Sequence, residues 1–143
     1  GYGFITCLED LYIKNRNAKA VLKYPQEASI LMPIKLLDPV NDWLAAATNT
    51  GYLLIFKAAD LPRLAKGKGN KIINIPAKKA KNQEEYVVSM TSLMENQQLR
   101  VQSGKRKLIL KPKDLEHFKG QRAQRGHLLP QGLRRVENLI TVE

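Results

Sequence analysis

The chain has 143 residues, of which 43% are apolar and 26% charged. This is enough for one hydrophobic core, and the composition argues against a disordered tail or a membrane protein. It carries 24 Lys and Arg against 13 Asp and Glu, a formal net charge of +11, which indicates an anionic partner such as nucleic acid. The single cysteine, Cys7, excludes an internal disulfide and argues against a stapled secreted domain.

Short runs of β-branched and aromatic residues predict a mostly β chain with turn residues between the strands. The predicted strands are 2–8, 19–24, 29–37, 42–48, 52–57, 70–75, 85–91, 97–102, 106–110 and 133–142. Three short segments, 8–14, 58–65 and 112–118, predict helical turns, the last with proline at a favourable first helical position. Long apolar stretches with a 3.6-residue period are absent, so we expect helices to be a minor component.

The positive charge is concentrated in the last two thirds of the chain. Residues 1–50 are neutral, residues 51–100 carry a net charge of +5, and residues 101–143 carry +6. This polarity favours a specific basic surface. A solvated basic face without a specific partner is the alternative.

Internal repetition has a period near 50 residues. The second copy repeats Gly1-Tyr2 as Gly51-Tyr52 and Asp10-Leu11 as Asp60-Leu61. The third copy contains Gly104-Lys105-Arg106, Asp114-Leu115 and Arg125-Gly126. Such a period is typical of a propeller-like array, in which single units are not stable alone. We predict repeat units 1–41, 42–92 and 93–143. Because residues 1–6 read as the middle of a strand, we expect a fragment of a longer protein.

Several strings carry a resemblance to a known family. The string Lys66-Gly67-Lys68-Gly69-Asn70-Lys71-Ile72-Ile73-Asn74-Ile75-Pro76, preceded by Asp60-Leu61-Pro62, resembles the C-terminal domain of the A subunits of bacterial topoisomerase IV. Similar strings begin at Gly1 and Gly104, so the resemblance spans almost the whole chain. The related gyrase domain carries a Gln-Arg-Arg-Gly-Gly-Arg-Gly signature, which does not occur in this chain. The resemblance therefore favours topoisomerase IV.

The resemblance implies an all-β pinwheel, a propeller-like disc whose neighbouring blades exchange a strand, with about three blades in this chain. It implies duplex DNA binding and bending along a basic rim, which controls the choice among DNA crossings in decatenation and supercoil relaxation. The parent enzyme is an ATP-dependent type II topoisomerase of the bacterial cytoplasm, at the nucleoid. Its nucleophilic tyrosine and its use of ATP and Mg²⁺ lie elsewhere, so we expect no catalytic residue and no cofactor here. Expected partners are duplex DNA, the other subunits of an A2B2 complex and a condensin-like segregation ATPase.

Basic loops recur at equivalent repeat positions and predict the DNA contacts, because Lys and Arg that neutralise phosphates release counterions. These residues are Arg16 and Lys19; Lys66, Lys68 and Lys71; and Lys119, Arg122 and Arg125. A second predicted cluster, Lys105, Arg106 and Lys107, has the alternative role of a charged edge that blocks aggregation. Glycines 67, 69, 120 and 126 either admit a phosphate to the backbone or only supply turn geometry.

Other chemistry is set aside. Cys7, His117 and His127 lack the spacing of metal ligands. Aromatic residues 2, 4, 43 and 56 lie in apolar strands, which favours core packing over base stacking. Lys78, Lys79 and Lys81 read as a solvated linker. A propeller that docks an acidic protein remains the main alternative, and a ribosomal-type RNA-binding protein is disfavoured by the repeat.

Overall fold

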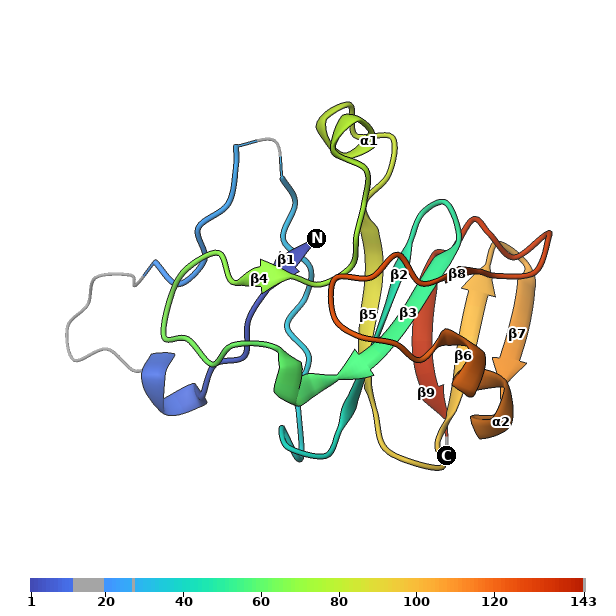
Figure 1. Cartoon of the computed structure of the whole chain (residues 1–143), viewed down its shortest axis with the longest axis horizontal. Coiled ribbons are helices and arrows are strands. Elements are labelled where there is room, and N and C mark those ends of the chain that lie inside the picture. The colour runs from blue at the N-terminus through green and yellow to red at the C-terminus, as the bar shows by residue number, and fades with distance from the viewer. Residues whose placement is uncertain (12–19, 27, 143) are drawn as a thin grey trace.

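Three antiparallel sheets make up most of the regular structure of this computed structural model, which describes residues 1–11, 20–26 and 28–142 (Figure 1). The strand orders are β5-β2-β3-β8, β7-β6-β9 and β1-β4. The strands are β1 Tyr2–Gly3, β2 Trp43–Thr48, β3 Tyr52–Lys57, β4 Asn70–Lys71, β5 Val87–Leu93, β6 Gln98–Ser103, β7 Arg106–Leu110, β8 His127–Leu128 and β9 Asn138–Val142. The helical turns are η1 Leu8–Leu11, η2 Ala58–Asp60, α1 Ala77–Lys81, α2 Pro112–Leu115 and η3 Glu116–Phe118. The mostly β prediction is therefore confirmed.

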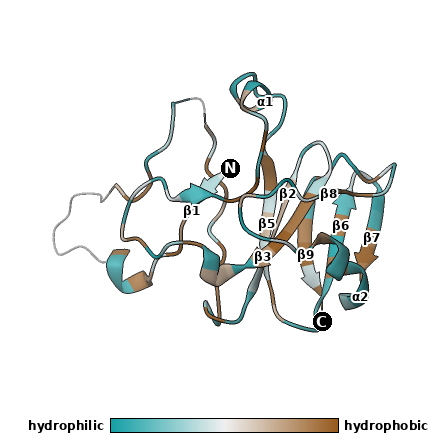
Figure 2. Cartoon of the chain, in the orientation of Figure 1, coloured by the Kyte–Doolittle hydropathy of each residue, from teal (hydrophilic) through white to brown (hydrophobic). Residues whose placement is uncertain are grey.

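The β2–β3 hairpin is buried on both faces. Its side chains alternate between two cores, with Ala45 and Ile55 in one and Ala46 and Phe56 in the other. The first core is completed by the sheet of β6, β7 and β9, and the second by Leu61 and segment 72–75. A strand covered on both faces needs a continuous apolar run, which β3 supplies with Leu53 to Phe56. Figure 2 accordingly shows hydrophobic colour along β3 and hydrophilic colour on α1 and α2.

The chain crosses between sheets in the same way twice. Strand β1 pairs with β4, which follows the β2–β3 hairpin, and β3 pairs with β8, which follows the β6–β7 hairpin. The same backbone bonds recur: Leu64 N–H donates to the Ile5 carbonyl and Gly120 N–H to the Ile55 carbonyl, both at 2.8 Å. In both crossings, an earlier strand, β1 or β3, thus pairs with a short strand that follows the next hairpin.

Two of the loop glycines are explained by this crossing. Gly69 and Gly126 have φ of +81° and +76°. A Cβ at Gly69 would collide with the carbonyl oxygen of Gly3, and a Cβ at Gly126 with that of Leu53. A positive φ combined with close backbone approach requires glycine. Turn geometry and strand packing therefore account for both residues.

The structure differs from the sequence prediction in several places. In the described part of the predicted strand 19–24, residues 20–24, only an isolated bridge at Leu22 forms, and residue 19 lies outside the described residues. The predicted strands 2–8, 70–75 and 133–142 shorten to β1, β4 and β9. Segment 29–37 was expected to be a strand but forms none; Pro33 interrupts it, and Ile30 and Met32 are 53% and 86% exposed. Segment 77–81 is helix α1 rather than a linker, since alanine and lysine are strong helix formers. Strand β8 was missed because two residues carry no periodicity.

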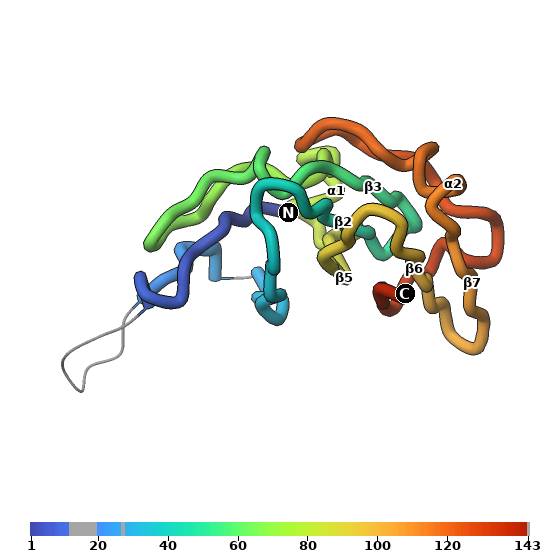
Figure 3. The backbone as a smooth tube through the Cα atoms, turned by 90° about the horizontal axis from the view of Figure 1, so that it is seen from below, coloured from blue at the N-terminus to red at the C-terminus, as the bar shows by residue number. Residues whose placement is uncertain are grey.

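Viewed from below, the backbone forms an arc (Figure 3). One edge of the arc, which we call the outer edge, is formed by segment 61–75 and by the segment from α2 to β8. Strands β5 and β6 and the C-terminal end of the chain lie on the opposite side. The segments that follow η2 and η3 therefore share one edge, although η2 ends at Asp60 and η3 at Phe118.

Candidate nucleic-acid interface

The first outer-edge segment carries three of the predicted lysines. Lys66 and Lys68 are exposed, and Lys71 is half-buried in β4. The Lys68 Nζ lies 4.0 Å from the centroid of the Tyr2 ring, and Tyr2 is 49% exposed, which makes its predicted core role wrong. This cation–π contact holds the ammonium group in place but does not neutralise its charge. This segment therefore offers three positive charges that no acidic side chain in the described residues pairs with.

The second outer-edge segment also carries three predicted residues, but each one contacts protein groups. Lys119 pairs with Glu116 at 2.6 Å, and its Nζ lies 4.5 Å from the centroid of the Trp43 ring. Arg122 Nη1 donates to the Lys71 carbonyl oxygen at 2.6 Å. That bond ties the two outer-edge segments together. In this segment the charge of Lys119 is therefore partly compensated by Glu116, and Arg122 forms a hydrogen bond that links the two outer-edge segments.

Arg125 makes the most extensive of these contacts. Its Nη2 donates to both carboxylate oxygens of Glu85, at 2.6 and 2.8 Å, and its Nη1 donates to the Asn74 carbonyl at 3.1 Å. The guanidinium also stacks 3.5 Å from the centroid of the Tyr52 ring. Arg125 thus joins the β3 strand, segment 72–75 and the residues that precede β5.

Glu85 is the buried acceptor of this cluster, with 1% of its surface exposed. Thr50 Oγ1 donates to it at 2.6 Å. Burial alone would raise the pKa of Glu85, but the hydrogen bonds from Arg125 and Thr50 and the charges of Arg125 and Lys79 outweigh it, and the pKa is held below its ordinary value. Sequence analysis missed Glu85, because nothing in the local pattern distinguishes it from the exposed Glu84.

The second predicted cluster lies apart from segment 61–71 (Figure 1). Lys105, Arg106 and Lys107 are all exposed, at the turn between β6 and β7 and along β7. In the described residues β7 is an edge strand, so protection of that edge and contact with an anion are both compatible with its charge. The predicted contacts Arg16 and Lys19 lie outside the described residues.

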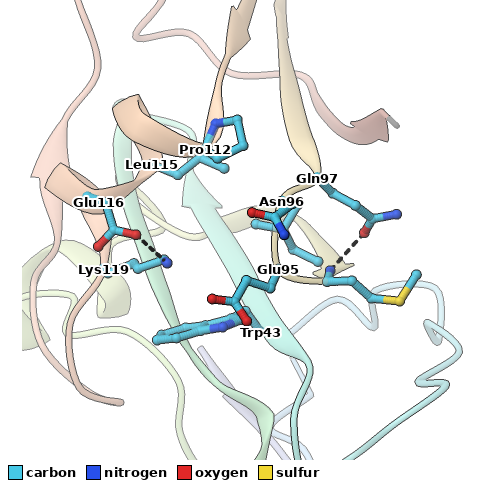
Figure 4. Close-up of a pocket in the computed structure, with 10 residues that line it drawn as sticks. Trp43, Glu95, Asn96, Gln97, Pro112, Leu115, Glu116 and Lys119 are labelled. Carbon is cyan, nitrogen blue, oxygen red and sulfur yellow. Dashed lines mark hydrogen bonds and ion pairs between the residues drawn. The ribbon is translucent and has the colours of Figure 1, made fainter.

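Trp43 is half-buried and forms one wall of a small cavity of about 70 Å³ rather than packing fully in the core. Pro112 and Leu115 of α2 and the turn at Glu95 complete much of its lining (Figure 4). The Lys119 ammonium points between Glu116 and the indole in the same view. By contrast, Phe56 is fully buried, as the sequence predicts.

The side chains that could bind a metal ion are scattered over the described residues. Those residues contain no group of three or more His, Cys, Asp or Glu that could hold a metal ion. His117 and His127 do come together, with ring centroids 4.5 Å apart, but both are exposed. Among the helices of the described residues, none has the length and apolar character required to cross a bilayer.

Comparison with known proteins gives the family. No family model matches the chain. The A subunit of DNA topoisomerase 4 from Pseudomonas aeruginosa is 48% identical over 140 residues, which cover 98% of this chain and 19% of that protein. The Haemophilus influenzae protein of the same name is 41% identical over 143 residues, 100% of this chain and 19% of that protein. The structure of the E. coli ParC C-terminal domain superposes with a TM-score of 0.87 at 39% identity, covering 99% of this chain and 56% of that one.

The chain is similar throughout to the C-terminal domain of the topoisomerase IV A subunits. The resemblance seen in its sequence is confirmed. A second structure, the C-terminal domain of a DNA topoisomerase IV, is 19% identical with a TM-score of 0.58 and shows the shared fold. The chain spans 19% of the length of each of the two full-length topoisomerase proteins named above.

Proposed function

We propose that this chain is a duplex-DNA-binding accessory domain of a topoisomerase IV A subunit. The observation that carries the proposal is the outer edge at 61–71, where Lys66, Lys68 and Lys71 have no acidic partner among the described residues. Lysines of this kind bind phosphates and release counterions, which gives affinity without reading sequence. The net charge of +11 supports the same partner.

The fold we propose for this role is the β-pinwheel, with repeat units 1–41, 42–92 and 93–143. The recurring strand crossings of β4 onto β1 and β8 onto β3 support it. The matching bonds of Ile72 N–H to the Gly1 carbonyl and Leu129 N–H to the Gly51 carbonyl, both 2.8 Å, support the 50-residue period. On this scheme neighbouring units interlock, and the arc of Figure 3 is a row of blades.

The predicted basic residues divide into two roles. We assign phosphate contact to Lys66, Lys68 and Lys71, together with the exposed Lys105, Arg106 and Lys107. Arg16 and Lys19 stay predicted contacts of the first unit. The remaining set, Lys119, Arg122 and Arg125, adds to the positive potential while its hydrogen bonds fix the curvature of the outer edge. A duplex that follows a curved cationic edge bends with it, at a cost of about 1–6 kcal/mol.

In the parent enzyme this binding would present a DNA segment to the breakage site and bias the choice among crossings in decatenation and supercoil relaxation. We infer association with the other topoisomerase IV subunits in the bacterial cytoplasm at the nucleoid. The same cationic edge could instead dock an acidic protein, such as a segregation ATPase. The salt dependence of binding separates these functions, because phosphate contacts give a slope of about −0.9 per neutralised phosphate on B-DNA.

The experiment is a salt titration of binding to duplexes of random sequence. The variant Lys66→Glu/Lys68→Glu/Lys71→Glu is compared with Lys35→Glu/Lys57→Glu/Lys111→Glu, which makes the same charge change at exposed positions outside segments 61–75 and 112–128. We expect the first variant to lose affinity for all sequences alike and to flatten the salt slope. Equal affinities for the two variants would overturn the assignment of the outer edge.

A further inference from the structure

A second cationic site lies at the turn end of the β6–β7 hairpin. A cavity of about 250 Å³ is lined there by Ser103, Gly132, Arg134 and Arg135. Arg106 reaches the same place from β7, because a Cβ at Gly132 would collide with its Nη1. In Figure 1 the loop that follows β8 runs back past this turn before it enters β9. The fold therefore brings together three arginines from two segments.

The loop between β8 and β9 is held by hydrogen bonds from side chains to backbone carbonyls. These bonds leave most of the guanidinium nitrogens available to a ligand. Ser103 Oγ donates to the Arg135 carbonyl at 2.8 Å. Arg134 Nε donates to the Leu129 carbonyl at 3.0 Å, so only its terminal nitrogens remain. The ion pairs of the described residues involve Lys119 and Arg125, and none involves these three arginines. Arg106, Arg134 and Arg135 are all exposed.

Arg134 and Arg135 line the cavity, and Arg106 lies against Gly132 beside it. Positive groups held this close repel one another unless an anion joins them. Guanidinium groups bind phosphate oxygens through paired, charge-assisted hydrogen bonds. No acidic residue lines the cavity. Gly132, with φ of +90°, lets Arg106 lie directly over the backbone. The chemistry of the cavity is therefore that of an oxyanion site.

The preceding repeat has positive charge in the equivalent place. Helix α1 lies between β4 and β5, as the loop with Arg134 and Arg135 lies between β8 and β9. Its lysines, Lys78, Lys79 and Lys81, are exposed. Figure 1 shows α1 and the loop after β8 along the same upper margin of the molecule, away from segment 61–69. The positive charge thus recurs along a second line on the surface.

We propose that Arg106, Arg134 and Arg135 form a phosphate site that takes a backbone phosphate of duplex DNA. The proposal rests on the proposed function and adds a contact on a different margin from Lys66, Lys68 and Lys71. A duplex that contacts both the outer edge and this arginine site would cross the molecule rather than follow the outer edge alone. The probes are inorganic phosphate and, separately, a short duplex of random sequence.

The site is tested with a variant that spares the fold. Arg106→Gln/Arg135→Gln removes two charges whose side chains make no hydrogen bond in the described residues. Arg134 is left in place, because it packs against Gly51 and bonds Leu129. Lys35→Gln/Lys57→Gln is the charge-matched control at exposed positions outside the outer edge. Equal thermal unfolding midpoints establish that both variants are folded.

Two readouts are combined. In glycine-labelled protein, with 9 glycines in the chain, both phosphate and duplex should shift the Gly132 amide signal, and Arg106→Gln/Arg135→Gln should abolish that shift. We expect the same variant to weaken duplex binding about tenfold and to reduce the salt slope by about 1–2. The control variant should change each by less than a factor of about two.

Three results would overturn the site. One is duplex binding that depends on Lys66, Lys68 and Lys71 but is unchanged in Arg106→Gln/Arg135→Gln. Another is a Gly132 shift with phosphate and none with duplex, which would mean a site for free anions only. A wild-type chain that binds no duplex would overturn the proposed function as well, so the two failures are distinguishable.

Discussion

Arg125 donates two hydrogen bonds to Glu85, which lies 40 residues earlier in the chain, in an ion pair whose carboxylate is buried and whose guanidinium is partly exposed. The pair joins the segment after η3 to the residues before β5. A buried ion pair destabilises strongly when one partner is removed, because the other charge is left without compensation. The contact therefore controls how the outer edge is attached to the first sheet.

The first prediction concerns the loss of this pair. Arg125→Ala should lower the free energy of unfolding by about 3–5 kcal/mol, because the carboxylate of Glu85 stays buried without its partner. Urea unfolding followed by circular dichroism measures the change. The double variant Arg125→Met/Glu85→Gln should recover a large part of the loss, since it removes both charges. A double variant as unstable as Arg125→Ala would contradict this account.

The second prediction is a pH dependence of stability. Because folding holds the pKa of Glu85 below its ordinary value of 4.5, the ionised form is favoured in the folded state. The resulting stability is present at neutral pH and is lost as the pH falls through the lowered folded-state pKa. Unfolding curves of the wild type and Glu85→Gln between pH 7 and pH 2 should therefore converge at the acid end. A constant difference across that range would contradict the prediction.

The third prediction concerns the glycines at the strand crossings. Gly69→Ala and Gly126→Ala combine a left-handed backbone, which costs about 1–2 kcal/mol for a residue with a Cβ, with collisions against the Gly3 and Leu53 carbonyls. Gly104→Ala is the matched control, because its φ is +61° but nothing lies within 4 Å of the added Cβ. We expect a clearly larger drop in the unfolding midpoint for the crossing glycines than for Gly104→Ala. Equal drops would mean that backbone conformation alone matters.

The fourth prediction separates the two roles proposed for the basic residues. Lys66→Gln should weaken duplex binding severalfold and reduce the salt slope by about 1. Lys119→Gln should change duplex affinity less, because the Lys119 ammonium already contacts Glu116 and Trp43. Fluorescence anisotropy of a labelled duplex measures both affinities. A larger loss for Lys119→Gln would reverse the proposed roles.

Local sequence was a good guide where strands are long. The predicted strand 52–57 is β3, and 106–110 is β7, because continuous apolar or alternating runs between turn residues specify a strand without tertiary information. The turn at 112–118 is likewise confirmed as α2 and η3, with Pro112 at the helix start. The family was also recognisable, because the similarity to it extends over 98% of the chain.

The rest depends on tertiary contacts. Segment 29–37 has the composition of a strand, yet no neighbour in the described residues pairs with it as one. Of the predicted strand 70–75 only the two residues of β4 pair as a strand, and the two residues of β8 carry no periodic signal. The residues around Glu85 in the sequence do not predict its ion pair with Arg125. Those around Arg134 do not predict that Arg106 lies close to the same loop. The charged residues could be counted from the sequence, but their pairing and their division between two margins could not.

Strand β4 pairs with β1 over two positions, and β8 with β3 over two, whereas β2 pairs with β3 over five positions and with β5 over six. We therefore expect a load along the outer edge to open the short pairings at the crossings before the hairpins. The outer edge would then bend elastically when DNA binds. A duplex laid on it and the protein beneath would each yield until their bending forces balance, so the radius of the bound DNA depends on the stiffness of both molecules.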